Sequence, residues 1–131
     1  MIAFYSTYES KNILNTPSYT ININSGEIKC IASGSYTQVP TFTPDGKRIV
    51  YMSGKDCEIF PLEVQGADWW IVNADGSGAK RLTYMNMKNH PQSVNHYRLA
   101  GSLSFISDSC FLGGIMTNPL GLTGYTAKVE F

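Results

Sequence analysis

The sequence lacks any apolar run long enough to cross a membrane as a helix, and it lacks an excess of charge of either sign. No window approaches the roughly 18 consecutive apolar residues that a spanning helix requires. Ten Lys and Arg balance ten Asp and Glu, so the formal net charge is zero. The cations are scattered, whereas nucleic-acid binding needs several of them on one face. We therefore exclude a membrane span and expect no nucleic-acid partner.

Catalytic and metal-binding motifs are also missing. There is no Gly-x-Ser-x-Gly nucleophile elbow and no Gly-rich phosphate loop that leads into a helix. The three cysteines are odd in number and have no Cys-x-x-Cys spacing, which excludes a zinc ribbon and a thioredoxin-like motif. We expect no enzyme active site confined to this chain, no cofactor and no metal site.

The cysteines differ in their surroundings. Cys30 and Cys110 lie in apolar runs, so we expect both thiols to be buried. Cys57 stands between Asp56 and Glu58. Because these charges disfavour a thiolate, we do not expect Cys57 to be a reactive nucleophile.

One segment has the pattern of four strands joined by tight turns. Apolar strands flank the pairs Asp45-Gly46 and Asp75-Gly76. Gly accepts the positive φ that two-residue turns require, so these pairs are typical of hairpins. The basic pairs Lys47-Arg48 and Lys80-Arg81 follow the turns, and we expect their charges to be solvated. The whole segment, Val39 to Ser53 and Trp69 to Thr83, predicts one complete blade of a β-propeller.

Partial copies of this blade lie on both sides of it. Met1 to Ser6 resembles Arg48 to Ser53, and Ser104 to Ser109 resembles Thr41 to Gly46. The first pair of segments is 47 residues apart, and four-stranded blades usually repeat every ~40 to 50 residues. We predict an all-β fold, a partial β-propeller of two to three four-stranded antiparallel blades in a single domain, 1–131. The expected blade segments are about 1–35, 36–85 and 97–131.

The strands 49–52 and 69–72 are apolar at consecutive positions, which is typical of strands covered on both faces. We interpret them as the innermost strands. Since successive side chains alternate, Trp69 and Trp70 are expected on opposite faces. Core packing explains both indoles, whereas an exposed Trp70 would be a contact residue. Gly113-Gly114 lies within a strand and predicts a bulge or a close approach of the backbone.

Fewer than three full blades do not close a ring, because propellers use roughly four to eight. Met1 begins inside a strand with no preceding turn. We therefore expect the C-terminal part of a longer propeller, whose other blades come from the rest of that chain. Closure by a homo-oligomer is the alternative.

A polar stretch from Tyr84 to Gly101 interrupts the strand pattern. Loops of this length are usually functional or disordered. Its two histidines have no third ligand beside them, so we expect no metal site in this stretch. We predict that the loops at about 54–67 and 84–97 recognise a protein or a small ligand. The predicted binding residues are His90, Asn95, His96 and Trp70.

The middle blade resembles the TolB-like, or WD40-like, β-propeller family. The segments that match its blade signature are Phe42 to Lys47, Asn73 to Gly78 and Arg81 to Thr83, whereas Ser107 to Ser109 departs from its Pro-Asp-Gly turn. The resemblance implies a non-catalytic binding scaffold without a cofactor, often periplasmic, whose last blade is completed by an N-terminal strand. Related propellers also belong to prolyl-oligopeptidase-like peptidases and oligogalacturonate-type lyases, so the propeller portion of an enzyme is the alternative.

Overall fold

The computed structural model describes residues 1–10, 12, 14–59, 66–93, 96–118 and 123–131. These residues form strands and no helix, so the all-β prediction is confirmed. The described part of the chain therefore contains no helix long and apolar enough to cross a membrane. The strands are β1 (Ile2–Tyr5), β2 (Ser18–Ile21), β3 (Ile28–Ala32), β4 (Thr37–Phe42), β5 (Arg48–Ser53), β6 (Asp68–Asn73), β7 (Lys80–Arg81), β8 (Leu99–Ser107), β9 (Cys110–Met116) and β10 (Gly124–Glu130).

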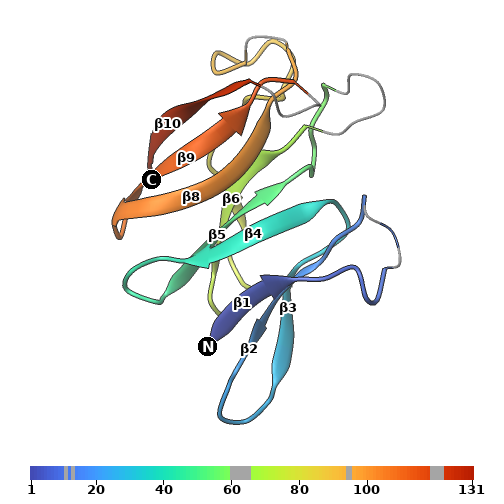
Figure 1. The fold of residues 1–131 in the computed structure, drawn as a ribbon, viewed down its shortest axis with the longest axis vertical. Coiled ribbons are helices and arrows are strands. Elements are labelled where there is room, and N and C mark those ends of the chain that lie inside the picture. Colours follow the sequence, from blue (N-terminus) through green and yellow to red (C-terminus); the bar gives the residue numbers. More distant parts are fainter. Residues whose placement is uncertain (11, 13, 60–65, 94–95, 119–122) are drawn as a thin grey trace.

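The strands form three antiparallel sheets that follow one another along the chain (Figure 1). The first sheet has the order β1-β2-β3, the middle sheet β4-β5-β6-β7, and the last sheet β10-β9-β8. Among the described residues, only the middle sheet has four strands. The arrangement is that of a partial propeller whose sheets do not close into a ring.

The turns of the middle sheet owe their shape to glycine and aspartate. Gly46 and Gly76 have φ angles of 70° and 84°, which L side chains rarely adopt. The Asp45 carboxylate accepts a hydrogen bond from the Lys47 amide, at 3.0 Å. The β8–β9 hairpin forms without Pro or Gly, and there the Ser109 amide donates to the Ser107 hydroxyl. A local side-chain acceptor therefore supports this turn in place of the Pro-Asp-Gly sequence.

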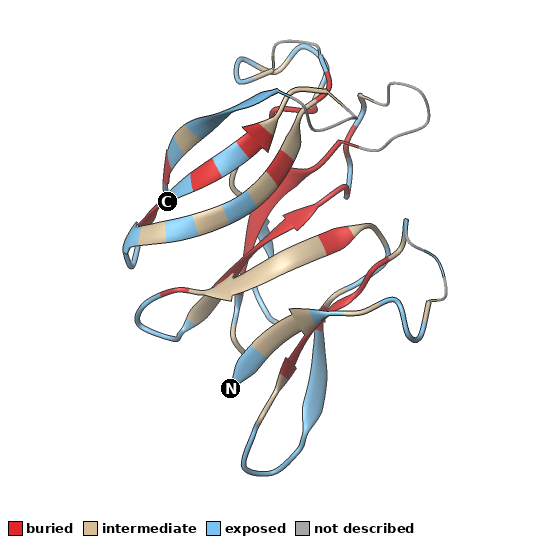
Figure 2. Cartoon of the chain, in the orientation of Figure 1, coloured by how far each residue is buried: buried red, intermediate tan, exposed pale blue. Residues whose placement is uncertain are grey.

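The middle sheet is covered on both faces, as its apolar strands predict (Figure 2). The prediction that these strands are innermost is wrong, because β5 and β6 are the two central strands and β4 lies at an edge. Val50 and Trp69 face a core shared with the last sheet. Ile49 and Trp70 face a core shared with the first sheet. The consecutive apolar residues thus divide between two cores.

Gly113 marks a close approach, as predicted. A Cβ at this position would lie 2.2 Å from Cζ2 of Trp69. Trp69 is fully buried, and its indole packs edge-to-face on Phe111 with the ring centroids 5.3 Å apart. The middle and last sheets can therefore meet here only because β9 has no side chain at residue 113.

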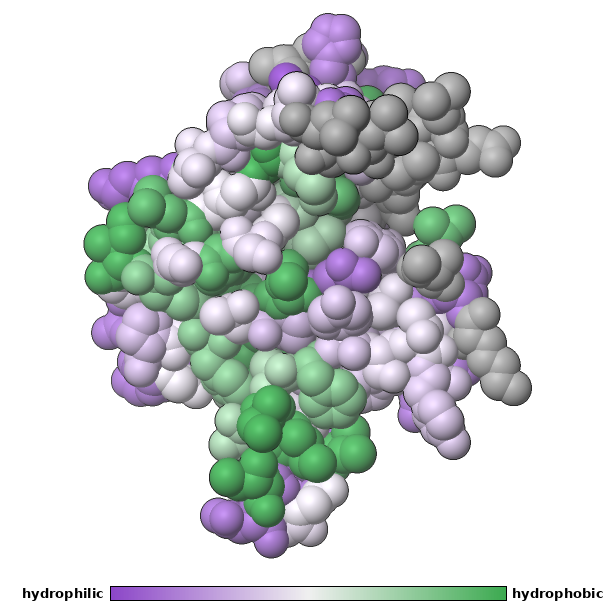
Figure 3. Space-filling model, in the orientation of Figure 1, coloured by the Kyte–Doolittle hydropathy of each residue, from purple (hydrophilic) through white to green (hydrophobic). Residues whose placement is uncertain are grey.

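The outer face of the first sheet exposes apolar side chains. Ile2, Ile21 and Ile28 form one row across its three strands. Ile2 and Ile28 are 54% and 59% exposed, and Figure 3 shows apolar surface over this sheet. Cys30 is also exposed, so the prediction that it is buried is wrong, whereas Cys110 is buried as predicted. Cys30 lies on β3, an edge strand, where it pairs with Tyr19 of β2. Its neighbour Ile31 faces the core shared with the middle sheet, so the Cys30 side chain lies on the opposite face.

Candidate functional site

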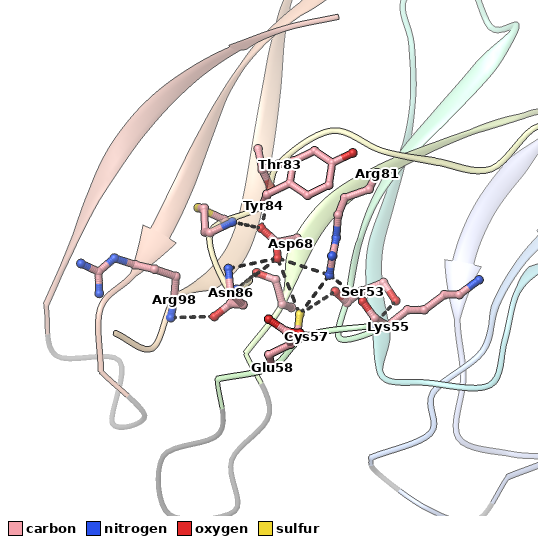
Figure 4. A network of polar contacts seen from close by, with 12 residues as sticks. Ser53, Lys55, Cys57, Glu58, Asp68, Arg81, Thr83, Tyr84, Asn86 and Arg98 are labelled. Carbon is pink, nitrogen blue, oxygen red and sulfur yellow. Dashed lines mark hydrogen bonds and ion pairs between the residues drawn. The ribbon is translucent and has the colours of Figure 1, made fainter. Parts of the chain in front are cut away.

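A fully buried carboxylate, that of Asp68, lies at the start of β6 (Figure 4). Its Oδ1 atom accepts hydrogen bonds from the Thr83 hydroxyl at 2.9 Å and the Met85 amide at 2.7 Å. Its Oδ2 atom accepts one from the Asn86 amide at 3.3 Å. Backbone donors from the segment after β7 therefore converge on Asp68 and hold that segment against the middle sheet.

Arg81 is the charged partner of Asp68. Its Nη2 atom lies 3.6 Å from Oδ2 of Asp68 and donates to the Lys55 carbonyl at 2.7 Å. Its Cζ atom lies 5.3 Å from the Trp70 ring centroid and 5.5 Å from that of Tyr84. Arg81 is buried, so the prediction of a solvated charge is wrong at this residue. Alternation along β7 leaves Lys80 exposed and turns Arg81 onto the indole.

Asn86 extends the network to Arg98, the residue directly before β8. Its Nδ2 atom donates to the Ala67 carbonyl at 3.1 Å, and its Oδ1 atom accepts from the Arg98 amide at 3.1 Å. A Cβ on Gly66 would lie 2.2 Å from that oxygen. The buried Asn86 side chain thus joins the residues that precede β6 and β8, and the missing side chain of Gly66 leaves room for it.

The segment 84–93 above this network has a fixed shape. The His90 ring stacks on Tyr84 with the centroids 4.4 Å apart. The Gln92 Oε1 atom accepts from the Tyr84 amide at 2.8 Å, and the Gln92 amide donates to Nδ1 of His90 at 3.2 Å. The Lys88 amide donates to the Glu58 carboxylate at 2.6 Å. The segment is therefore pre-organised, and its exposed residues are Lys88, Asn89, Pro91 and Gln92.

The predicted binding residues have different environments. His90 is half-buried in the stack on Tyr84, and His96 is exposed. Trp70 is only 7% exposed, which contradicts its prediction as a surface contact. It packs in the core with the first sheet, and Arg81 and Lys55 lie against its ring. Asn95 and residues 60–65 of the predicted loops lie outside the described residues.

The sequence interpretation missed Asp68, Arg81 and Asn86. The available signal was a carboxylate directly before the most apolar strand, with an arginine where the next strand begins. That pattern is equally typical of solvated strand ends, and only the packing of 83–86 against β6 makes it a buried network. Within the described ranges, no three His, Cys, Asp or Glu side chains gather as metal ligands do.

Cys57 belongs to the buried network. Its thiol lies 3.6 Å from Oδ2 of Asp68 and donates toward it. Burial, and next the negative charge of Asp68, raise the pKa of this thiol to about 12. The thiolate is thus disfavoured as predicted, but Asp68 is the charged cause in place of Asp56 and Glu58. A reactive nucleophile needs the opposite shift.

Stability should fall as the pH rises from about 9 to 12. Burial also raises the pKa of Tyr51 to about 12. In the unfolded chain a thiol loses its proton near pH 8.5 and a phenol near pH 10. The unfolded state therefore binds fewer protons across this range, and the free energy of unfolding decreases with pH.

Urea unfolding of the wild type and of Cys57→Ser at a series of pH values measures this effect. The serine hydroxyl does not ionise here, so the variant should lack the part of the decrease that begins near pH 9. Identical pH profiles for the two proteins would show that Cys57 does not contribute.

Comparison with known proteins gives a likeness of fold. No protein-family model and no curated protein matches the sequence. The structure is similar to the crystal structure of TolB from Acinetobacter baumannii, with a TM-score of 0.63 and 16% sequence identity. The match covers 98% of this chain and 26% of that chain, so this chain spans about a quarter of the TolB length. The three open sheets have a TolB-like β-propeller fold.

Proposed function

We propose that the chain is a non-catalytic binding scaffold, in which segment 84–93 and the adjoining residues 54–59 recognise a protein or a small ligand. The observation that carries this proposal is the pre-organisation of 84–93 by the contacts of Gln92, His90 and Glu58. A segment already held in one shape loses little conformational entropy on binding. Binding residues are often found on such loops, positioned by a rigid sheet.

The two segments form one surface. The Glu58 amide donates to the Asn86 carbonyl at 2.8 Å, and the Glu58 carboxylate accepts from the Lys88 amide. Below them, Arg81 binds the Lys55 carbonyl and contacts the Tyr84 ring. The surface offers an ammonium group, a carboxylate, an amide and an imidazole edge, which suits a polar partner with both donors and acceptors.

The fold likeness and the family resemblance support two finer parts of the proposal. The first is a periplasmic or otherwise extracytoplasmic location. The second is coverage of the apolar outer face of the first sheet, where Ile2 and Ile28 are exposed, by further blades of a longer chain or by another copy. Sheets of a propeller are covered on both faces, as the middle sheet is here.

Photo-crosslinking tests the binding surface. A photoreactive amino acid at Lys88 should capture a partner from an extract of the source cells, whereas the same group at Ser25 should not. Ser25 is also exposed but lies in the β2–β3 turn of the first sheet. Purified partner should then bind His90→Ala about tenfold more weakly, a loss of ~1.4 kcal/mol, because the ring no longer fixes Gln92.

The matched control is Lys29→Ala, on β3, which should bind the captured partner as the wild type does. Equal affinity of the wild type and His90→Ala for every captured partner, or equal capture from Lys88 and Ser25, would remove segment 84–93 from the proposal.

A further inference from the structure

One hydrogen bond in segment 84–93 depends on the charge of a side chain. The Gln92 amide donates to Nδ1 of His90 at 3.2 Å, so this ring nitrogen carries no proton. An imidazole that accepts at Nδ1 is neutral and holds its proton on Nε2. The bond closes a turn, residues 90–92, around Pro91. Because histidine side chains ordinarily change charge between about pH 5 and 8, acid can remove the acceptor of this turn.

The His90 ring itself is held in place whatever its charge. It stacks on Tyr84 with the centroids 4.4 Å apart and 20° between the ring planes. An imidazolium also stacks on a tyrosine ring, because the π face attracts a cation. The His90 backbone amide donates to the Met87 carbonyl at 3.4 Å in either state of the ring. Protonation therefore acts on the bond to Gln92 and leaves the ring on Tyr84.

Loss of this bond affects the exposed part of the recognition surface. When Nδ1 is protonated, it becomes a donor and two N–H groups face each other. The Gln92 amide then has no acceptor in the turn. The Gln92 Oε1 atom accepts from the Tyr84 amide at 2.8 Å, so Gln92 also connects the turn to the start of the segment. Opening of the turn thus displaces Pro91 and Gln92, which are both exposed.

The surrounding charges do not reverse this direction. The Arg81 guanidinium lies 5.5 Å from the centroid of the same Tyr84 ring and repels a second cation there. The Glu58 carboxylate attracts a cation, but it already accepts from the Lys88 amide. Asp68 pairs with Arg81, and Glu130 pairs with Lys128. The described charged groups on and beside the segment are Lys55, Asp56, Glu58, Asp68, Arg81, Lys88, Arg98, Lys128 and Glu130.

We propose that His90 is a proton-sensitive switch of the recognition surface, in which the neutral ring holds the 90–92 turn in its binding shape and the protonated ring releases it. The ordered turn binds one proton fewer than the open turn, so ordering increases with pH. Affinity for the polar partner therefore falls in mildly acidic solution. This inference rests on the proposed function, because it assigns regulation to the same surface.

Nuclear magnetic resonance of the chain alone tests the switch without a partner. At about pH 7.5 the nitrogen chemical shifts of His90 should show a proton on Nε2 and none on Nδ1. As the pH falls to about 5, the Gln92 amide proton should move upfield in step with protonation of His90. His90→Asn is the matched variant, because the Asn carbonyl can accept from the amide two residues on and does not titrate. Its Gln92 resonance should stay constant over this range.

Affinity for the purified partner captured through Lys88 tests the consequence. Between about pH 7.5 and about 5 the wild type should lose about fivefold more affinity than His90→Asn does, which is the usual worth of one hydrogen bond. His96→Ala should behave as the wild type, because His96 has no part in the turn.

The switch is overturned by any of three results. They are a proton on Nδ1 at about pH 7.5, a Gln92 amide that does not follow the protonation of His90, and equal losses of affinity in the wild type and His90→Asn. If no partner is captured, the proposed function fails, whereas the ring and amide measurements still decide whether His90 controls the turn.

Discussion

Replacing Asp68 by Ala is expected to lower the free energy of unfolding by about 3 to 5 kcal/mol, because the change leaves a buried guanidinium without its counter-charge. Arg81 is 8% exposed and Asp68 is fully buried. The same change removes the acceptor of the Met85 and Thr83 donors. Buried donors that lose their acceptor add to the cost.

The reverse truncation should cost less. Arg81→Met leaves the Asp68 carboxylate with the Thr83 hydroxyl and the Met85 and Asn86 amides. The Cys57 thiol and Nδ2 of Asn86 also donate to it, so five donors still solvate the charge. The methionine side chain can still cover the Trp70 ring. The network thus predicts that Asp68→Ala lowers the free energy of unfolding more than Arg81→Met does. A simple ion pair without the other donors would predict similar losses for the two variants.

Urea unfolding followed by circular dichroism measures the three proteins, with Asp108→Ala as the control. Asp108 is exposed in the β8–β9 turn, and its loss should change stability by no more than about 0.5 kcal/mol. If Asp68→Ala costs no more than this control, the Asp68 network does not stabilise the fold. If Arg81→Met costs more than Asp68→Ala, the backbone donors are not the main partners of the carboxylate.

Gly113→Ala is expected to destabilise the fold by about 3 kcal/mol, the upper end of the usual cost of overpacking a core. The new methyl group would lie 2.2 Å from Cζ2 and 2.6 Å from Cη2 of Trp69. The indole has little freedom to move, because Phe111 packs on it and its Nε1 atom donates to the Gly101 carbonyl at 3.3 Å. The middle and last sheets would have to separate locally.

The neighbouring glycine provides a matched control on the opposite face of β9. A Cβ on Gly114 would be 3.8 Å from the nearest atom, the Ser102 carbonyl oxygen, which is ordinary contact. Gly114→Ala should therefore change the free energy of unfolding by less than about 0.5 kcal/mol. Trp69→Phe should recover part of the loss in Gly113→Ala, and a double-mutant cycle measures this coupling. Equal effects of the two glycine substitutions would contradict the close approach at residue 113.

The strands and turns of the middle sheet could be predicted from the sequence because their signals are local. Asp45-Gly46 requires only the φ preference of glycine and the reach of one carboxylate. The alternating positions of Trp69 and Trp70 follow from strand geometry alone. Gly113 could be recognised as a close approach, although its contact, the Trp69 indole, could not be named.

The buried network could not be predicted, because it depends on tertiary contacts. Arg81 follows an exposed lysine and resembles a solvated strand end until Trp70 and Tyr84 are placed around it. Cys30 lies in an apolar run, yet the outer face of its sheet is open. The prediction of Trp70 as a surface residue was wrong because the first sheet and Arg81 cover its ring. Sequence alternation identifies the face of a strand but not what covers that face.

The central claim is that the middle sheet packs against a different sheet on each face, and the two adjacent indoles test it directly. Nuclear Overhauser contacts of the Trp69 ring should be to the last sheet, at Gly113, Phe111 and Ile115. Those of the Trp70 ring should include Ile31 and Ala3 of the first sheet. If both rings contact the same sheet, or if Trp70 shows no contact with the first sheet, the blade arrangement is contradicted.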